Sequence, residues 1–127
     1  MIVLDASVLI AHLDSAGTHH SQAAELLAGA VEDAFGISPI TLAECYVGPA
    51  RSGRLDDAQS QIRHLEIEVV PMGEGGPERL ATLRARTGLR MPDCCVLLAA
   101  ETASAEVATF DTRLSQAART IGLTVRG

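Results

Sequence analysis

The amino-acid sequence predicts an α/β protein, a three-layer α/β/α sandwich around a mostly parallel five-stranded sheet. Five short apolar runs alternate with helix-like segments along the chain, a pattern typical of parallel sheets that helices cover on both faces. Hydrophobic residues make up 47% of the chain, yet it contains only two Phe, one Tyr and no Trp, so its core must consist mainly of aliphatic side chains. A length of 127 residues fits one compact domain, and we expect a single domain over residues 1–127.

The first part of the chain predicts two strands and two helices. Residues 2–4 are all apolar and predict a buried strand, and residues 6–13 follow as a helix. Apolar residues recur at helical spacing through residues 19–30, which predicts the second helix. A second short strand is expected over residues 34–37.

The third helix has the clearest start signal in the sequence. Ser38 is suited to cap a helix, and Pro39 after it occupies the first helical position, where proline is favoured. The helix is expected to continue through Glu44 and to end near Gly48 and Pro49, because proline disrupts a helix interior.

The second half continues the alternation of helices and strands. Pro71 ends an apolar run, Gly88 is a plausible residue to follow a helix, and Pro92 opens the next helix. Helices are expected over residues 54–65, 77–87, 92–103 and 111–121, and strands over residues 67–70, 106–109 and 123–125.

The charge of the chain bears on its partners. The net charge of −6 is unfavourable for binding nucleic acid, but several acids are candidate metal ligands whose charge a cation would offset. All ten basic residues are Arg; Arg suits bidentate contacts to phosphate, although genomic base composition is an alternative explanation. The scarcity of aromatic residues argues against RNA-binding modules that stack bases on aromatic rings.

The cysteines indicate a reducing compartment. Cys45, Cys94 and Cys95 are odd in number and form no CxxC pair, which fits buried reduced thiols in a cytoplasmic protein. Because a strand-like run begins at Ile2, we expect no signal peptide. The uncharged run over residues 94–100 is too short to span a membrane.

Four acidic residues are the main functional candidates. Asp5, Glu44, Asp93 and Asp111 each lie at the end of a predicted strand or in a predicted helix close to its start. Parallel α/β folds bring such positions to one edge of the sheet, where four carboxylates would repel one another without a cation. Carboxylates without a His or Cys cluster favour Mg²⁺, with Mn²⁺ as an alternative.

Each acid also has a purely structural explanation. Asp5 and Asp111 can cap helices, Asp93 suits the first turn of a helix, and Glu44 can form a capping box with Thr41. The surrounding residues weaken these explanations for the first three acids, because each is set among apolar residues where an unpaired charge is costly. One shared cation explains them together.

Four motifs resemble those of a known family. In chain order they are DAS from Asp5, SPITLAE ending at Glu44, PD ending at Asp93, and TFD ending at Asp111. This order resembles the PIN-domain ribonucleases, and within them most closely the VapC toxins of bacterial toxin–antitoxin pairs, over essentially the whole chain. Many relatives have a further acid two residues after the fourth and an aromatic residue after it, where this chain has Arg113 and Leu114. The resemblance therefore does not extend to the ligands of a second metal ion.

The resemblance implies a metal-dependent endoribonuclease. The first three acids would hold Mg²⁺ directly or through water, and the fourth would complete the acidic pocket. The metal would make hydroxide available near neutral pH, and in-line attack would leave a 5′-phosphate and a 3′-hydroxyl without a His or Lys general base. Ser7 and Thr109 would support the acids by hydrogen bonds, with capping of the first helix as an equal alternative for Ser7.

Arginines are the expected contacts to RNA or to a partner protein. Arg79, Arg86 and Arg90 are spaced by seven and four residues, which places them on one stripe if their helix continues that far. A solvated helix face is the alternative. Arg51 and Arg54 flank a short flexible segment after the Glu44 helix.

The resemblance also implies partners: a VapB-like antitoxin that covers the acidic pocket, and a second copy of the chain in a homodimer. Two other functions remain open from the sequence alone. One is a PIN nuclease of RNA maturation or decay that is not a toxin. The other is a Mg²⁺-binding receiver module, which needs a Lys that this chain lacks.

Overall fold

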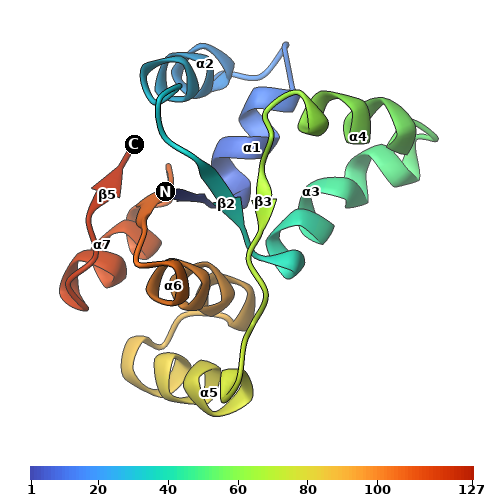
Figure 1. The fold of residues 1–127 in the computed structure, drawn as a ribbon. Helices are drawn as coiled ribbons and strands as arrows, with labels where there is room; N and C mark the ends of the chain where they lie inside the picture. Colours follow the sequence, from blue (N-terminus) through green and yellow to red (C-terminus); the bar gives the residue numbers. More distant parts are fainter.

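A five-stranded sheet forms the middle layer of the protein, as described for all residues 1–127 by a computed structural model (Figure 1). The sheet order is β3-β2-β1-β4-β5, and every neighbouring pair of strands is parallel. The strands are β1 (Ile2–Leu4), β2 (Phe35–Ile37), β3 (Glu68–Val69), β4 (Glu106–Ala108) and β5 (Val125–Arg126). The predicted α/β/α fold is confirmed, and the sheet is entirely rather than mostly parallel.

Seven helices surround the sheet. They are α1 (Ala6–Leu13), α2 (His20–Gly29), α3 (Pro39–Arg51), α4 (Leu55–Arg63), α5 (Gly76–Thr87), α6 (Met91–Ala103) and α7 (Thr112–Thr120). In Figure 1, α1 and α2 lie on one side of the sheet and α5 and α6 on the other. None of the seven has the length and hydrophobicity that a membrane-spanning segment requires.

The central strand β1 contributes to the core on both faces of the sheet. Side chains alternate along a strand, so Ile2 and Leu4 pack with residues of α1 and α2, whereas Val3 packs with residues of α5, α6 and α7. All three side chains are at most 1% exposed. Helix α6 is the most buried helix, since every residue from Cys94 to Ala100 lies in the core.

Helix α3 begins where the sequence predicts and ends later. The Ser38 hydroxyl accepts a hydrogen bond from the backbone N–H of Ile40 at 3.3 Å. The predicted end near Gly48 and Pro49 is wrong, because the helix continues to Arg51 with Pro49 inside it. A proline this close to the end of a helix removes only one hydrogen bond, and the Ser52 hydroxyl donates to the carbonyls of Gly48 and Pro49 there.

The remaining elements agree with the predicted ones in type and order. The largest differences among the strands are at β5, which shares only Val125 with the strand expected over 123–125, and at β3, which has two residues instead of the four expected over 67–70. Helix α5 ends at Thr87 because Gly88 adopts a left-handed conformation with φ of 69°, which glycine adopts without strain. The chain therefore turns sharply between α5 and α6.

Candidate active site

The candidate site lies where the chain reverses its direction across the sheet. From β1 the chain builds outward to β2 and β3, and then returns through α5 and α6 to β4 on the other side of β1. The carboxyl ends of β1 and β4 are thus adjacent, with Asp5 and Thr109 following them. In open parallel sheets such a switch point forms a crevice that binds ligands.

Asp5 is a buried carboxylate held by two hydroxyl groups. It is 7% exposed, and its Oδ2 accepts hydrogen bonds from Ser7 Oγ at 2.7 Å and from Thr109 Oγ1 at 2.8 Å. Asp5 precedes α1, but its side chain makes no capping hydrogen bond to that helix. The capping explanation is therefore wrong for Asp5, and the carboxylate is oriented by the site.

The two hydroxyls are themselves oriented by backbone amides. Phe110 N–H donates to Ser7 Oγ at 3.0 Å, and Asp111 N–H donates to Thr109 Oγ1 at 3.0 Å. Each hydroxyl accepts from the chain after β4 and donates to Asp5. This network joins the ends of β1 and β4, and it fixes the position of one carboxylate oxygen of Asp5.

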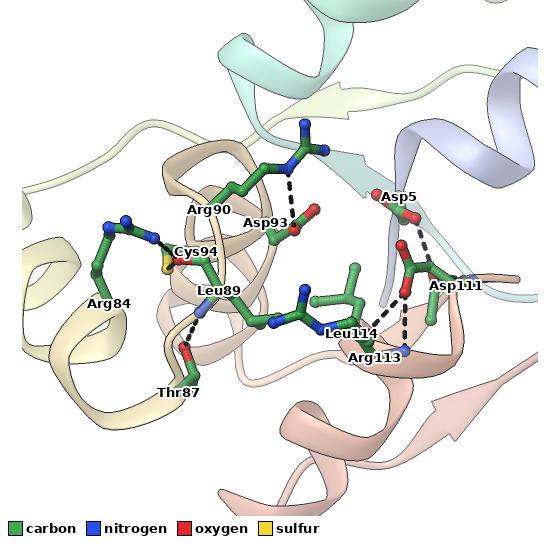
Figure 2. A network of polar contacts seen from close by, with 11 residues as sticks. Asp5, Arg84, Thr87, Leu89, Arg90, Asp93, Cys94, Asp111, Arg113 and Leu114 are labelled. Carbon is green, nitrogen blue, oxygen red and sulfur yellow. Dashed lines mark hydrogen bonds and ion pairs between the residues drawn. The ribbon is translucent and has the colours of Figure 1, made fainter.

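Asp111 caps α7. Its Oδ1 accepts hydrogen bonds from the backbone N–H groups of Arg113 at 2.8 Å and of Leu114 at 3.1 Å. The structural explanation considered for Asp111 is thus confirmed. The residue still borders the site, because Figure 2 shows the carboxylates of Asp5, Asp93 and Asp111 facing one another, and its Oδ2 takes no part in the cap.

Asp93 lies in the first turn of α6 with its side chain 18% exposed. Burial raises the pKa of the Asp93 carboxyl, and the nearby charges of Asp5 and Asp111 raise it further, while Arg90 and Arg113 oppose the rise. The Arg90 Nε lies 3.9 Å from an Asp93 oxygen. Figure 2 shows Arg90 and Arg113 on either side of Asp93.

Glu44 enters the site from the second turn of α3. Burial raises the pKa of the Glu44 carboxyl, and the charges of Asp5 and Asp93 add to that rise. The considered capping box with Thr41 is not formed, since the Thr41 hydroxyl is buried without any hydrogen-bond partner. Glu44 therefore faces the other acids without a structural partner of its own.

The four acids suit a hard cation that keeps part of its water shell. No three His, Cys, Asp or Glu side chains lie close enough together to hold one ion among them. Mg²⁺ usually retains several waters and binds one or two carboxylates directly, so it does not need three carboxylates in direct contact. Burial, and after it the charges of neighbouring acids, raise the pKa values of Glu44 and Asp93, and a divalent cation would offset both effects.

Cys45 and His19 border this region but differ from the acids. Burial, together with the charges of Glu44 and Asp5, raises the pKa of the Cys45 thiol to about 12, so the residue stays a neutral thiol and not a thiolate ligand. His19 lines the same surface pocket as Asp111, and its Nδ1 lies 3.0 Å from the Gln22 side-chain oxygen. No local pattern in the sequence indicated this position of His19.

The predicted arginine stripe is not continuous. Because α5 ends at Thr87, Arg90 lies outside that helix and precedes α6 beside Asp93. Arg79 instead donates a hydrogen bond to Thr102 on α6 at 3.2 Å. Arg86, in the last turn of α5, lines a surface groove together with Arg113.

The other two arginines lie away from the acids. Arg51 is in the last turn of α3, seven residues beyond Glu44, or about 10 Å along the helix axis. Arg54 lies before α4 and lines a separate small pocket with Asp57. Arg113 is the cation that sequence reasoning missed as a site residue; its only signal was its place two residues after Asp111.

One known protein family covers almost the whole chain. Residues 2–120 match the family model of the PIN domain. No protein of curated function matches the chain.

Several solved structures share the fold. A toxin–antitoxin complex from Klebsiella pneumoniae has 24% identity and a TM-score of 0.73, covering 100% of this chain and 97% of that one. FitAcB from Neisseria gonorrhoeae has 22% identity and a TM-score of 0.77 over the same shares. Mycobacterium tuberculosis VapC20, a Sarcin-Ricin loop cleaving toxin, has 17% identity and a TM-score of 0.76, covering 92% of this chain and 95% of that one. With the family match over residues 2–120, the chain belongs to the PIN-domain family.

Proposed function

We propose that the protein is a Mg²⁺-dependent endoribonuclease that acts as the toxin of a VapBC-type toxin–antitoxin pair. The observation that carries the proposal is the buried Asp5 carboxylate, held by two hydroxyls and facing Asp93 and Asp111 at the switch point of a PIN domain. PIN domains are nucleases, and membership of this family removes the receiver alternative.

In this proposal Asp5, Glu44 and Asp93 hold the cation directly or through water, and the Oδ2 of Asp111 completes the pocket. A divalent ion held there would supply polarisation of the scissile phosphate and hydroxide near neutral pH. Mn²⁺ can replace Mg²⁺, since both prefer oxygen ligands.

The protein groups contribute orientation and charge. Ser7 and Thr109 engage one oxygen of Asp5, and no protein group donates to its other oxygen, which leaves that oxygen for the cation or its water. Arg90 and Arg113 place positive charge beside Asp93, which favours an approaching phosphate. In-line attack of water on this phosphate leaves a 5′-phosphate and a 3′-hydroxyl.

A cleavage assay tests the chemistry. The purified protein is incubated with structured RNAs in Mg²⁺ and in EDTA, and the Asp5→Asn variant is incubated in Mg²⁺. We expect cleavage only by the unmodified chain in Mg²⁺. Equal cleavage in all three reactions would overturn the metal mechanism.

The toxin role is supported by the fold shared with a toxin–antitoxin complex from Klebsiella pneumoniae and with the toxin VapC20. It implies a VapB-like antitoxin that inserts a basic side chain into the acidic pocket, a homodimer, and action in the cytoplasm. Expression of the chain should arrest growth, and Asp93→Ala should relieve the arrest. Arrest that persists in the variant would mean that the acidic pocket is not its cause, and an absence of arrest would favour a nuclease of RNA maturation or decay.

A further inference from the structure

A second surface feature lies beside the acidic pocket. It is a groove of about 320 Å³ between the end of α5 and helix α7. Its lining includes Arg86, Leu89, Arg113, Gln116 and Thr120. We call it the arginine groove.

The arginine groove is positively charged although the protein carries a net charge of −6. No acidic residue lines it. The guanidinium groups of Arg86 and Arg113 form no hydrogen bond or ion pair within the chain, whereas Arg84 nearby donates to the carbonyl of Leu89. Two like charges that share a groove without an acid repel each other, and a bound anion relieves this repulsion.

The hydroxyl groups around the groove are already used. Thr120 Oγ1 donates to the Gln116 carbonyl at 2.9 Å, and Thr87 Oγ1 donates to the Leu83 carbonyl at 2.7 Å. The guanidinium groups are therefore the main free donors, and they present charge and paired N–H groups. This composition suits a phosphate group better than the edge of a base.

The arginine groove borders the acids through two of its lining residues, Arg113 and Leu89. Arg113 lies close enough to Asp93 to oppose the rise of its pKa, and the Arg113 backbone N–H donates to Asp111 at 2.8 Å. Leu89 in the groove wall precedes Arg90, which pairs with Asp93. Figure 2 shows Arg113 and Leu89 next to Asp93.

We propose that the arginine groove binds a backbone phosphate of the RNA strand that flanks the scissile phosphate, with Arg86 and Arg113 as its ligands. This inference rests on the proposed nuclease function and adds a binding site to it. An RNA strand lying across both features places one phosphate at the cation-binding acids and another between the two arginines. Arg113 thereby links the two sites.

An acidic protein segment is the other class of anion that fits two arginines. A guanidinium pairs with phosphate and with carboxylate alike, so the position of the groove decides between them. The observations favour RNA, because Arg113 lies beside Asp93, where a phosphate must reach the cation. An acidic segment that followed the same path would meet the carboxylates of Asp93 and Asp111.

RNA binding in EDTA tests the groove without requiring cleavage. The anisotropy of a fluorescently labelled single-stranded RNA is measured with the unmodified chain, with R86Q/R113Q, and with R63Q as a control. Arg63 ends α4, far from α5 and α7. The double variant should bind about tenfold more weakly, and the slope of log affinity against log salt should fall by about 0.7 for each phosphate that the variant no longer neutralises. The control should match the unmodified chain.

A second variant separates charge from folding. R86K/R113K keeps both charges without the planar guanidinium groups, so it should retain most of the salt slope and bind better than R86Q/R113Q. Thermal unfolding should be the same in all variants, since neither side chain is buried.

The outcomes distinguish this inference from the proposed function. If R86Q/R113Q bound RNA with unchanged affinity and still cleaved RNA in Mg²⁺, the proposed phosphate site in the groove would be wrong. The proposed nuclease function would be unaffected. Unchanged RNA affinity in a variant that no longer binds a co-expressed partner protein would assign the groove to that partner and overturn the proposal. If the unmodified chain neither bound nor cleaved RNA, both proposals would fail.

Discussion

The two halves of the acidic pocket are built differently. The strand half consists of Asp5 and Asp111, whose carboxylates accept hydrogen bonds from hydroxyls or backbone amides. The helix half consists of Glu44 and Asp93, which accept no hydrogen bond and whose pKa values burial and neighbouring acids raise. The strand half is positioned by the chain itself, whereas the helix half lacks a compensating partner other than the arginines. We infer that the strand half positions the carboxylates of the site. The helix half contributes carboxylates whose negative charge is compensated within the chain only by the arginines and favours a bound cation.

The largest expected effect is at Asp5, the centre of the strand half. Asp5→Asn keeps the size of the side chain and an oxygen for Ser7 and Thr109, but removes the charge. RNA cleavage in Mg²⁺ should fall by about a thousandfold. The exposed Asp57→Asn on α4 is the matched control and should retain full activity. A comparable loss in both variants would show that the effect is not specific to the pocket.

Removing a hydroxyl that donates to Asp5 should cause the next largest loss of activity. Thr109→Val removes the donor to Asp5 and the acceptor for the Asp111 amide with little change in volume. Activity should fall about tenfold to a hundredfold, as for outer partners of other metal sites. The Mg²⁺ concentration for half-maximal activity should rise as well. Unchanged Mg²⁺ dependence would mean that the strand half does not depend on this hydrogen bond for its geometry.

Two substitutions of Asp111 distinguish its role as a helix cap from the role of its negative charge. Asp111→Asn keeps an oxygen for the backbone amides of α7, whereas Asp111→Ala removes the cap and should cost about 1 kcal/mol of stability. Both variants should lose part of the activity, because both remove the charge facing Asp93. Thermal unfolding and cleavage measured together check this. Full activity in Asp111→Asn would assign Asp111 to the cap alone.

The helix half should make stability depend on pH when no metal is bound. A carboxyl with a raised pKa in the folded state contributes stability at low pH, and this contribution is lost as the pH rises through that raised pKa. The metal-free protein should therefore lose stability from about pH 4.5, the ordinary Glu value, toward neutrality. Glu44→Gln should flatten this dependence in chemical unfolding measured across pH. An unchanged pH dependence of stability in the variant would show that ionisation of Glu44 does not contribute to it. This is the smallest of the expected effects, because solvent screens partly exposed carboxyls.

The sequence predicted those features that depend on local patterns. The apolar runs identified all five strands, and Ser38 with Pro39 identified the start of α3. These signals depend only on residues that are close together in the sequence. The same reasoning selected Asp5, Glu44 and Asp93 from their apolar surroundings, and the structure brings these acids within electrostatic reach of one another.

Features that depend on tertiary placement were missed or wrong. The condition for an arginine stripe is not met, because the left-handed turn at Gly88 redirects the chain before Arg90. The only local signal at Arg113 was its place two residues after Asp111, and its position in the groove follows from the packing of α7 beside the end of α5. Asp111 had two local explanations, and the structure confirms that it caps α7.

We propose that the four acids together bind a divalent cation, and titration calorimetry with Mg²⁺ measures this binding most directly. The unmodified chain should bind Mg²⁺ with a measurable heat, and Asp5→Asn and Asp93→Asn should each abolish this binding, while the exposed Asp57→Asn leaves it intact. Binding of Mg²⁺ to both pocket variants with the affinity of the unmodified chain would contradict the account.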